Sequence, residues 1–175
     1  MAPEEKTTVY WSKLVHEAWS LHLAATDKGL VYVGSQGAPL AEAEKWANGR
    51  LPGAVLVRDD ERLAPYIREL IEYFRGERQR CEQPFDLRGT AFQQAVWRAL
   101  REIPYGRTAT YSDIAAAIGR PSAVRAVGAA IGANPVLIHV PCHRVIGKNG
   151  ALTGFRGGLE MKARLLGLER DGTGG

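Results

Sequence analysis

Hydrophobic residues alternate with polar ones in three short segments of the first half of the chain. These segments span residues 7–14, 20–35 and 53–59, and the middle one contains the turn sequence Asp27-Lys28-Gly29. Alternation with a period of two indicates strands, and a short Asp/Gly turn between apolar runs indicates a hairpin. The pattern therefore predicts an antiparallel meander or hairpin.

Helical spacing follows in two further segments of the same half. Residues 39–49 begin at a proline and end at Asn48-Gly49, whereas residues 59–77 begin with an acidic turn. The second segment places five apolar residues on one helix face: Leu63, Ile67, Leu70, Ile71 and Phe74. Strands accompanied by two helices predict a small α+β domain over residues 1–83.

The pattern becomes mainly helical in the second half of the chain. Pro84 and Gly89 mark a predicted linker at about residues 82–89, and a second domain is expected over residues 84–175. It opens with helical spacing over residues 90–106, where five apolar residues share a face: Phe92, Val96, Trp97, Leu100 and Ile103.

Two short helical segments then have the proportions of a helix-turn-helix. The first runs from Tyr111 to Gly119, a tight turn passes through Arg120-Pro121, and the second runs from Ser122 to about Ile131. Helical hairpins rich in alanine and glycine are also common in proteins that do not bind nucleic acid. The pattern alone therefore leaves both interpretations open.

The second of these helices has little side-chain bulk. Val124, Val127 and Ile131 share one face and are expected to seat the helix on the core. Alanines and a glycine occupy much of the remaining surface: Ala123, Ala126, Gly128, Ala129 and Ala130. Such a helix can be pressed against another protein helix or against a different surface, and Arg125 is the long side chain expected to project from it.

Charge divides the chain in the same place as the hydrophobic pattern. Residues 1–87 carry a net charge of −3 and residues 88–175 one of +7, which together give the overall +4. A basic half is expected of a polyanion-binding face, although a solvated basic surface explains it equally well.

The composition also bears on the compartment. The N-terminal sequence carries acidic residues where a signal peptide needs basic and then apolar ones, and no apolar run approaches ~20 residues. We therefore expect a cytoplasmic protein without a membrane span.

The chain contains two cysteines, Cys81 and Cys142, which are too few for a disulfide scaffold and are expected to be free thiols. Cys142 lies in the stretch "NPVLIHVPCHRVIG", directly beside His143 and Arg144. A thiol becomes nucleophilic as the thiolate, which requires a base or a positive field. Neighbours on an extended strand point to opposite faces, so His143 would reach Cys142 through a water or on a bent segment.

A metal site is the weaker interpretation of this stretch. His139, Cys142 and His143 lack the paired spacing of a zinc site, and the other histidines, His16 and His22, lie far away in the sequence. A third group that orients the imidazole is expected of a catalytic cysteine, and the spacing does not identify it.

Five motifs in order connect these observations to a known family: "RAVG" at 125–128, "ANP" at 133–135, "PCHRV" at 141–145, "GALTGFRGG" at 150–158 and "KARLLGLE" at 162–169. They resemble the O6-alkylguanine-DNA alkyltransferases over essentially all of residues 84–175. Over residues 1–83 the resemblance is a compatible domain pattern, and it implies a ribonuclease-H-like α+β fold. The second domain is then a mainly helical, winged-helix-like helix-turn-helix domain.

The resemblance implies a role for each residue around the cysteine. Cys142 would attack the alkyl carbon on guanine O6 and keep the alkyl group, once and irreversibly. His143 would act as the base through a bridging water, and Glu169 would hold its tautomer. Asn134 would brace the turn beside the site.

The resemblance also implies how DNA is bound. Arg125 would fill the space left by a flipped nucleotide, and Tyr111 would crowd the phosphate to promote its rotation. Further substrate or DNA contacts are implied for a set of residues: Ser112, Arg120, Gly128, Val145, Lys148, Phe155 and Arg156. The implied partner is double-stranded DNA that contains O6-alkylguanine, bound through the minor groove by a monomer. Cooperative assembly on the DNA is left open, and no cofactor is expected.

Two positions depart from the family pattern, and the cysteines of a zinc site are missing from the first domain. Phe155 stands where the family often has tyrosine, so a stacking wall remains without a phenolic hydroxyl. Arg156 replaces a small hydroxyl residue of some members and is expected at the pocket rim, touching phosphate. Residues 1–80 contain no cysteine, so the zinc site of some members is not expected here.

Two alternatives of different classes remain. The first is a non-catalytic helix-turn-helix sensor of alkylated DNA, against which Cys142 argues because the related non-catalytic proteins lack the nucleophile. The second is a cysteine hydrolase that turns over and carries a basic patch.

Overall fold

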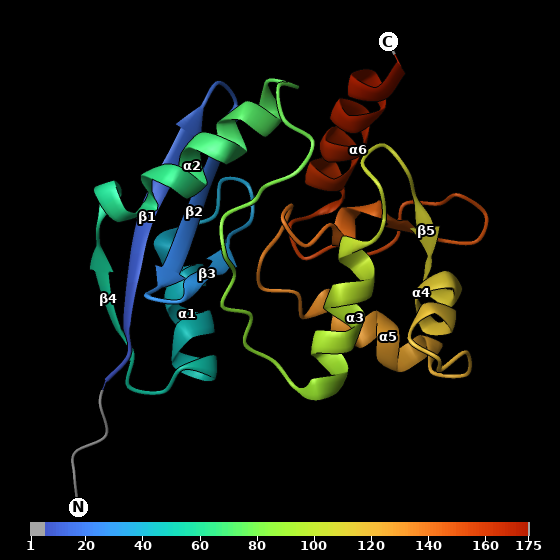
Figure 1. Ribbon diagram of the computed structural model, residues 1–175, viewed down its shortest axis with the longest axis horizontal. Coiled ribbons are helices and arrows are strands. Elements are labelled where there is room, and N and C mark those ends of the chain that lie inside the picture. Colours follow the sequence, from blue (N-terminus) through green and yellow to red (C-terminus); the bar gives the residue numbers. More distant parts are fainter. Residues whose placement is uncertain (1–5, 175) are drawn as a thin grey trace, which may run out of the picture.

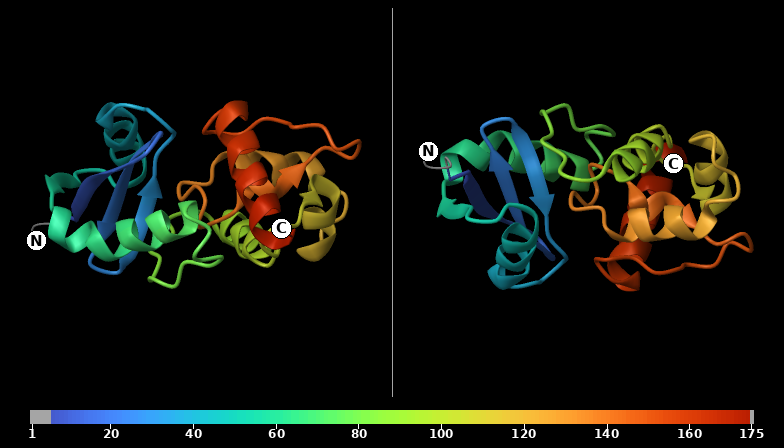
Figure 2. Two further views of the ribbon diagram at one scale, coloured as in Figure 1. Left: turned by 90° about the horizontal axis from the view of Figure 1, so that it is seen from above. Right: turned by 90° about the horizontal axis from the view of Figure 1, so that it is seen from below.

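The computed structural model describes residues 6–174, and its two halves lie side by side (Figure 1). The first half contains four strands and two helices: β1 (Thr8–His16), β2 (Trp19–Thr26), β3 (Gly29–Val33), α1 (Leu40–Arg50), β4 (Val55–Arg58) and α2 (Asp60–Phe74). The strands form one sheet in the order β3-β2-β1-β4. The helices α1 and α2 cover opposite faces of this sheet (Figure 2).

The predicted antiparallel meander is correct for β1, β2 and β3, but β4 pairs with β1 in parallel. The chain leaves β3, crosses one face of the sheet as α1 and returns to the opposite edge beside β1. A helical crossover of this length allows two strands to run in the same direction, which a short hairpin cannot do. The Asp27-Lys28-Gly29 turn connects β2 to β3 as predicted.

The second half is mainly helical, as predicted. Its elements are α3 (Ala91–Arg101), β5 (Ala109–Thr110), α4 (Tyr111–Ala117), α5 (Val124–Gly132), the 3-10 turn η1 (Cys142–Arg144), β6 (Val145–Ile146) and α6 (Leu159–Gly174). Thr90 begins α3 with a capping box, in which its hydroxyl accepts from the Gln93 amide and the Gln93 side chain accepts from the Thr90 amide. Thr110 and Asp113 begin α4 in the same way.

The expected buried face of α5 is only partly correct. Val127 and Ile131 are buried, but Val124 is 36% exposed, and Ala130, expected on the bare surface, is buried. Val124 is the first residue of α5. Ala126 and Ala129 are exposed beside Arg125, which leaves an almost smooth helix surface with one cation.

The predicted linker is an ordered segment that packs against the sheet. The amide of Leu30 donates to the carbonyl of Pro84, and the amide of Asp86 donates to the carbonyl of Leu30, both at 2.9 Å. A Cβ at Gly29, whose φ is +151°, would lie 2.5 Å from the Pro84 carbonyl oxygen, so this close approach requires glycine. The segment therefore covers the edge strand β3 that would otherwise expose unpaired backbone groups.

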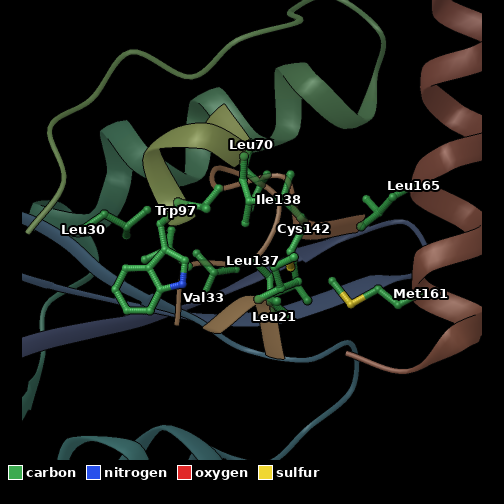
Figure 3. Packing of buried hydrophobic residues seen from close by; sticks show 14 of the residues in the cluster. Leu21, Leu30, Val33, Leu70, Trp97, Leu137, Ile138, Cys142, Met161 and Leu165 are labelled. Atoms are coloured by element: carbon green, nitrogen blue, oxygen red, sulfur yellow. The ribbon is translucent and has the colours of Figure 1, made fainter. Parts of the chain in front are cut away.

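The two halves share their main hydrophobic core. Leu21 and Val33 from the sheet, Trp97 from α3 and Leu165 from α6 belong to one buried cluster. Figure 3 shows Cys142 among these side chains, between the sheet and α6. A second, smaller cluster lies under α1 on the other face of the sheet. The segment that carries Cys142 is thus held by both halves of the molecule.

Candidate active site

Cys142 is the first residue of the 3-10 turn η1 and is 3% exposed. Asn134, directly after α5, reaches this turn with its side-chain amide: Nδ2 donates to the Cys142 sulfur at 3.1 Å and to the Val140 carbonyl at 2.9 Å. The Asn134 carbonyl oxygen Oδ1 accepts from the Val136 amide at 3.0 Å. One buried amide side chain therefore fixes both the loop after α5 and the sulfur.

The environment of the thiol contains opposing influences on its charge. Burial raises the pKa of the Cys142 thiol above its usual value, while the Asn134 hydrogen bond and the positive charges of Arg156 and Lys162 act to lower it. Burial prevails, so the pKa remains raised. Formation of the thiolate therefore needs a proton acceptor in addition to these cations.

His143 supplies a proton acceptor next to the thiol. Its Nε2 lies 2.5 Å from Oε2 of Glu169, and both side chains are buried. Burial lowers the pKa of His143 in spite of the carboxylate, so the imidazole is neutral near pH 7. A neutral ring that donates from Nε2 carries a lone pair on Nδ1, and Nδ1 is buried without a hydrogen-bond partner among the described residues. The bent turn, not an extended strand, presents His143 beside Cys142.

Glu169 on α6 accepts hydrogen bonds from several donors. Arg144 donates from Nε to Oε1 at 2.7 Å and from a terminal nitrogen to Oε2 at 3.1 Å. The Tyr73 hydroxyl, from α2, donates to Oε2 at 2.5 Å. Burial alone would raise the pKa of the Glu169 carboxyl, but the hydrogen bonds and charges of His143 and Arg144 outweigh it and lower the pKa to about 2. Glu169 is therefore a carboxylate at neutral pH.

Lys162 connects the loop after the cysteine to α6. Its side chain is fully buried, and its ammonium donates to the carbonyls of Val145, at 2.5 Å, and Thr153, at 3.3 Å. Thr153 also shares a hydrogen bond of 2.6 Å with the Tyr111 hydroxyl at the start of α4. The helix-turn-helix and the loop at 147–158 are therefore joined beside Cys142.

The helix-turn-helix presents its cations to solvent. Arg120 and Arg125 are exposed, as is Lys148 in the turn that follows β6, whereas Val145 is buried and Ser112 is half-buried. Gly128 on α5 faces the Tyr111 ring, with 3.8 Å from an added Cβ to the nearest ring carbon. The residues predicted to bind DNA thus divide into an exposed basic group and a group that is buried or half-buried.

Arg156, expected from the sequence at the pocket rim, makes several hydrogen bonds within the protein. Its guanidinium crosses to the first half of the chain, where it donates to the carbonyl of Val33 at 2.7 Å and the hydroxyl of Tyr32 at 3.1 Å. It also donates to the carbonyls of Asn134 and Pro135, each at 3.0 Å. A phosphate contact would require some of these bonds to break. Phe155, the preceding residue, packs against the main core.

Comparison with known proteins places this geometry in a family. The ribonuclease-like domain of 6-O-methylguanine DNA methyltransferase matches residues 9–87, and the DNA binding domain of the same proteins matches residues 91–171. The chain belongs to the 6-O-methylguanine DNA methyltransferase family. Members of this family repair DNA by direct alkyl transfer, and this chain is a DNA-repair methyltransferase of that kind.

Individual relatives agree with this family. The inducible methylated-DNA–protein-cysteine methyltransferase of Bacillus subtilis is 59% identical over 165 residues, which cover 94% of this chain and 92% of the relative. The O6-methylguanine methyltransferase structure from Mycobacterium tuberculosis has a TM-score of 0.79 at 39% identity and covers 93% of each chain. A structure of the M. tuberculosis protein in complex with DNA has a TM-score of 0.77 at 38% identity, covering 93% of this chain and 94% of that one.

Three residues of this methyltransferase site were not assigned a role from the sequence. Arg144 was noted as a cation beside the cysteine, and its bidentate contact with Glu169 appears only in the fold. Lys162 lies seven residues before Glu169 on one helix, and this spacing could have placed both on the same face. Tyr73 comes from the ribonuclease-like domain, and no local pattern connects it to Glu169.

The structure also bears on two expected absences. Across residues 6–174, three or more His, Cys, Asp or Glu side chains are nowhere grouped in a way that could hold a metal ion. Within the same range, the helices are too short or too polar to cross a membrane. The metal-free state and the cytoplasmic location remain predictions.

Proposed function

We propose that Cys142 of this methyltransferase is the residue that accepts the alkyl group, with His143 as its base and Glu169 as the group that orients His143. The observation that carries this proposal is the Nδ1 of His143, the residue that follows Cys142 on the same 3-10 turn: it is buried without a hydrogen-bond partner among residues 6–174, while Nε2 is held by the Glu169 carboxylate. A general base held in one tautomer by a carboxylate is the arrangement that activates weak nucleophiles.

The reaction can be followed through these atoms. The thiol proton passes to His143 Nδ1 through a bridging water, and the sulfur attacks the alkyl carbon on guanine O6. The carbon–sulfur bond forms as the carbon–oxygen bond breaks, and the purine leaves as guanine after taking up one proton. The Asn134 amide holds the sulfur in place during the attack. The product is a stable thioether, so each chain reacts once.

The proposed substrate is O6-alkylguanine in double-stranded DNA. The exposed surface of α5 is proposed to bind this DNA. Ala126 and Ala129 leave this surface without bulk, and Arg125 projects from it. A smooth helix with one long cation suits the narrow minor groove better than the major groove, which accepts larger side chains. Arg125 fills the gap left by the flipped nucleotide, and Tyr111 crowds its phosphate.

Other residues complete the proposed pocket. Phe155 provides a stacking wall for the flipped base, and Val145 and Gly128 shape its surroundings. Ser112, Arg120 and Lys148 contact the DNA backbone, and Arg156 maintains the wall by fixing the loop next to Phe155. The protein acts as a monomer without a cofactor.

One experiment separates this function from the two alternatives. The protein is incubated with duplex DNA that contains O6-methylguanine, and its intact mass is measured. A permanent gain of one methyl group per chain, located on the peptide that contains Cys142, supports the proposal. Binding without a mass change would support a non-catalytic sensor, and repeated turnover without a stable adduct would support a hydrolase.

A further inference from the structure

Tyr73 is a buried residue in the last turn of α2 that contacts the site from the ribonuclease-like domain. Its side chain is 2% exposed, and its ring packs edge-on against Tyr105, with 6.1 Å between ring centroids. Its hydroxyl crosses to α6, where it donates to Oε2 of Glu169 at 2.5 Å. It therefore connects the first domain directly to a charged residue of the proposed catalytic group.

The oxygen that Tyr73 contacts is also the one that His143 contacts. Nε2 of His143 lies 2.5 Å from Oε2 of Glu169, while Oε1 accepts from Arg144 at 2.7 Å and from the Gly106 amide at 3.3 Å. A terminal nitrogen of Arg144 also donates to Oε2, at 3.1 Å, so three donors share the negative charge of this oxygen and each weakens the bonds available to the others. Burial raises the pKa of Tyr73 well above its usual value, and the nearby Glu169 charge adds to this effect. The phenol therefore stays protonated and acts as a donor.

We propose that Tyr73 is a positioning residue through which the ribonuclease-like domain fixes the Glu169 carboxylate and sets the proton affinity of His143. This inference rests on the proposed function of Cys142, His143 and Glu169. It gives the first domain a part in the chemistry, because the DNA binding domain alone would leave Oε2 without this donor.

The other groups around the His143–Glu169 pair do not depend on the Tyr73 hydroxyl. Arg144 lies on the same turn as His143, Lys162 lies on α6, and Tyr105 follows α3; all three influence the charge of the pair. A change confined to the Tyr73 hydroxyl therefore isolates its contribution against an otherwise constant electrostatic background.

Tyr73→Phe removes the hydroxyl and retains the ring. Oε2 of Glu169 is then shared only by the Nε2–H of His143 and the longer contact from Arg144, so more of its charge acts on His143 and favours the protonated imidazole. The loss of one charge-assisted hydrogen bond corresponds to a rise of about one unit in the pKa of His143. Because the neutral imidazole is the base, the acid limb of the alkylation rate moves to higher pH by about the same amount.

The rate is measured by intact mass with free O6-benzylguanine between pH 5 and pH 8, which excludes effects on DNA binding. Nuclear magnetic resonance titration of the His143 ring provides an independent readout. Tyr66→Phe is the matched control, because Tyr66 is a buried tyrosine on the same helix that contacts the core and not Glu169. We expect the acid limb to move in Tyr73→Phe and to stay in place in Tyr66→Phe.

A purely structural role would give a different result. If Tyr73→Phe lowers the rate equally at every pH and leaves the His143 titration unchanged, the inference is wrong. Should the phenylalanine variant fail to fold, 3-fluorotyrosine at position 73 tests the same point with the opposite sign. Its more acidic phenol is a stronger donor, so the acid limb should move to lower pH, and an unmoved limb would again overturn the inference.

Failure of this inference can be distinguished from failure of the proposed function. If Cys142→Ser still gains the benzyl group, the assignment of the nucleophile is wrong whatever Tyr73 does. If Cys142→Ser is inert and Tyr73→Phe keeps the unaltered pH profile, the proposed function stands and the role of Tyr73 is rejected.

Discussion

The two cysteines of this methyltransferase are both shielded from solvent, yet their surroundings differ in the sign of the neighbouring charge. Cys81 lines a cavity of about 340 Å³ between the linker and the end of α3. Burial and the carboxylates of Glu69 and Glu72 raise the pKa of its thiol to about 12, with Arg78 opposing them only in part. Burial therefore keeps a thiol protonated unless the neighbouring groups stabilise the thiolate.

Cys142 is buried more deeply than Cys81, but its neighbours act in the opposite direction. Asn134 donates a hydrogen bond to the sulfur, Arg156 and Lys162 contribute positive charge, and the bare Nδ1 of His143 lies on the next residue. Accessibility alone would favour Cys81, the more exposed thiol, whereas the proposed function assigns the reaction to Cys142. If that proposal holds, the groups around a buried thiol, and not its accessibility, determine its reactivity.

The largest expected effect comes from replacing each cysteine in turn. Cys142→Ser should abolish alkyl transfer and leave DNA affinity largely intact, because a hydroxyl has nearly the same shape but is a far poorer nucleophile at neutral pH. Cys81→Ser should transfer the alkyl group at the original rate. The intact mass after incubation with O6-methylguanine DNA checks both variants. A methylated Cys142→Ser protein would show that Cys142 is not the residue that accepts the alkyl group.

The next effect separates the base from the cations around Cys142. Glu169→Gln removes the charge that orients His143, and the alkylation rate should fall by about a hundredfold, as expected when a general base is impaired. Single-turnover kinetics with O6-benzylguanine measure this loss. Glu160→Gln, an exposed position in the first turn of the same helix, is the control. An unimpaired Glu169→Gln protein would show that the cations alone activate the sulfur.

A smaller effect concerns the route by which DNA reaches Cys142. Arg125→Ala should slow repair of a duplex by about tenfold to a hundredfold, because a flipped nucleotide costs a few kcal/mol to hold out of the stack. Reaction with the free O6-alkylguanine base should be unaffected. The two rates are compared by intact mass. Equal losses on both substrates would mean that Arg125 supports the pocket or the fold.

The smallest expected effect is on stability after alkylation. An alkyl group on Cys142 displaces packed neighbours and removes the sulfur as an acceptor for Asn134, and such overpacking costs ~1–3 kcal/mol. The melting temperature should fall by about 2–10 °C, more for benzyl than for methyl. Superimposable melting curves for free, methylated and benzylated protein would contradict the expected strain at Cys142.

The pH dependence of stability tests the charges of Glu169 and His143 beside Cys142. The pKa of Glu169 is lowered to about 2 in the folded protein, from ~4.3 in the unfolded chain. Its contribution to the free energy of unfolding is therefore fully present above about pH 4.3 and is lost as the pH falls toward about 2. His143, whose pKa is also lowered, adds a loss that begins below about pH 6.5. Melting curves from pH 7 to pH 3 should decline accordingly, and less steeply for Glu169→Gln.

Much of the local structure follows from the sequence, because local contacts produce it. Thr90 and Gln93 form a capping box three residues apart, and the Asp27-Lys28-Gly29 turn closes a hairpin between adjacent strands. The motif around Cys142 likewise contains the proposed base and the bend of the chain within a few residues. These features need no information from distant parts of the chain.

Features that join distant segments were decided by the tertiary structure. The parallel pairing of β4 depends on the crossover of α1. Helical spacing placed Val124 on the buried face of α5, but in the fold it is 36% exposed. Arg156 donates to the Val33 carbonyl on β3, 123 residues earlier in the chain. Tyr73 reaches Glu169 over 96 residues. Sequence spacing carries no signal for such pairs, because the packing of two domains on one shared core brings them together.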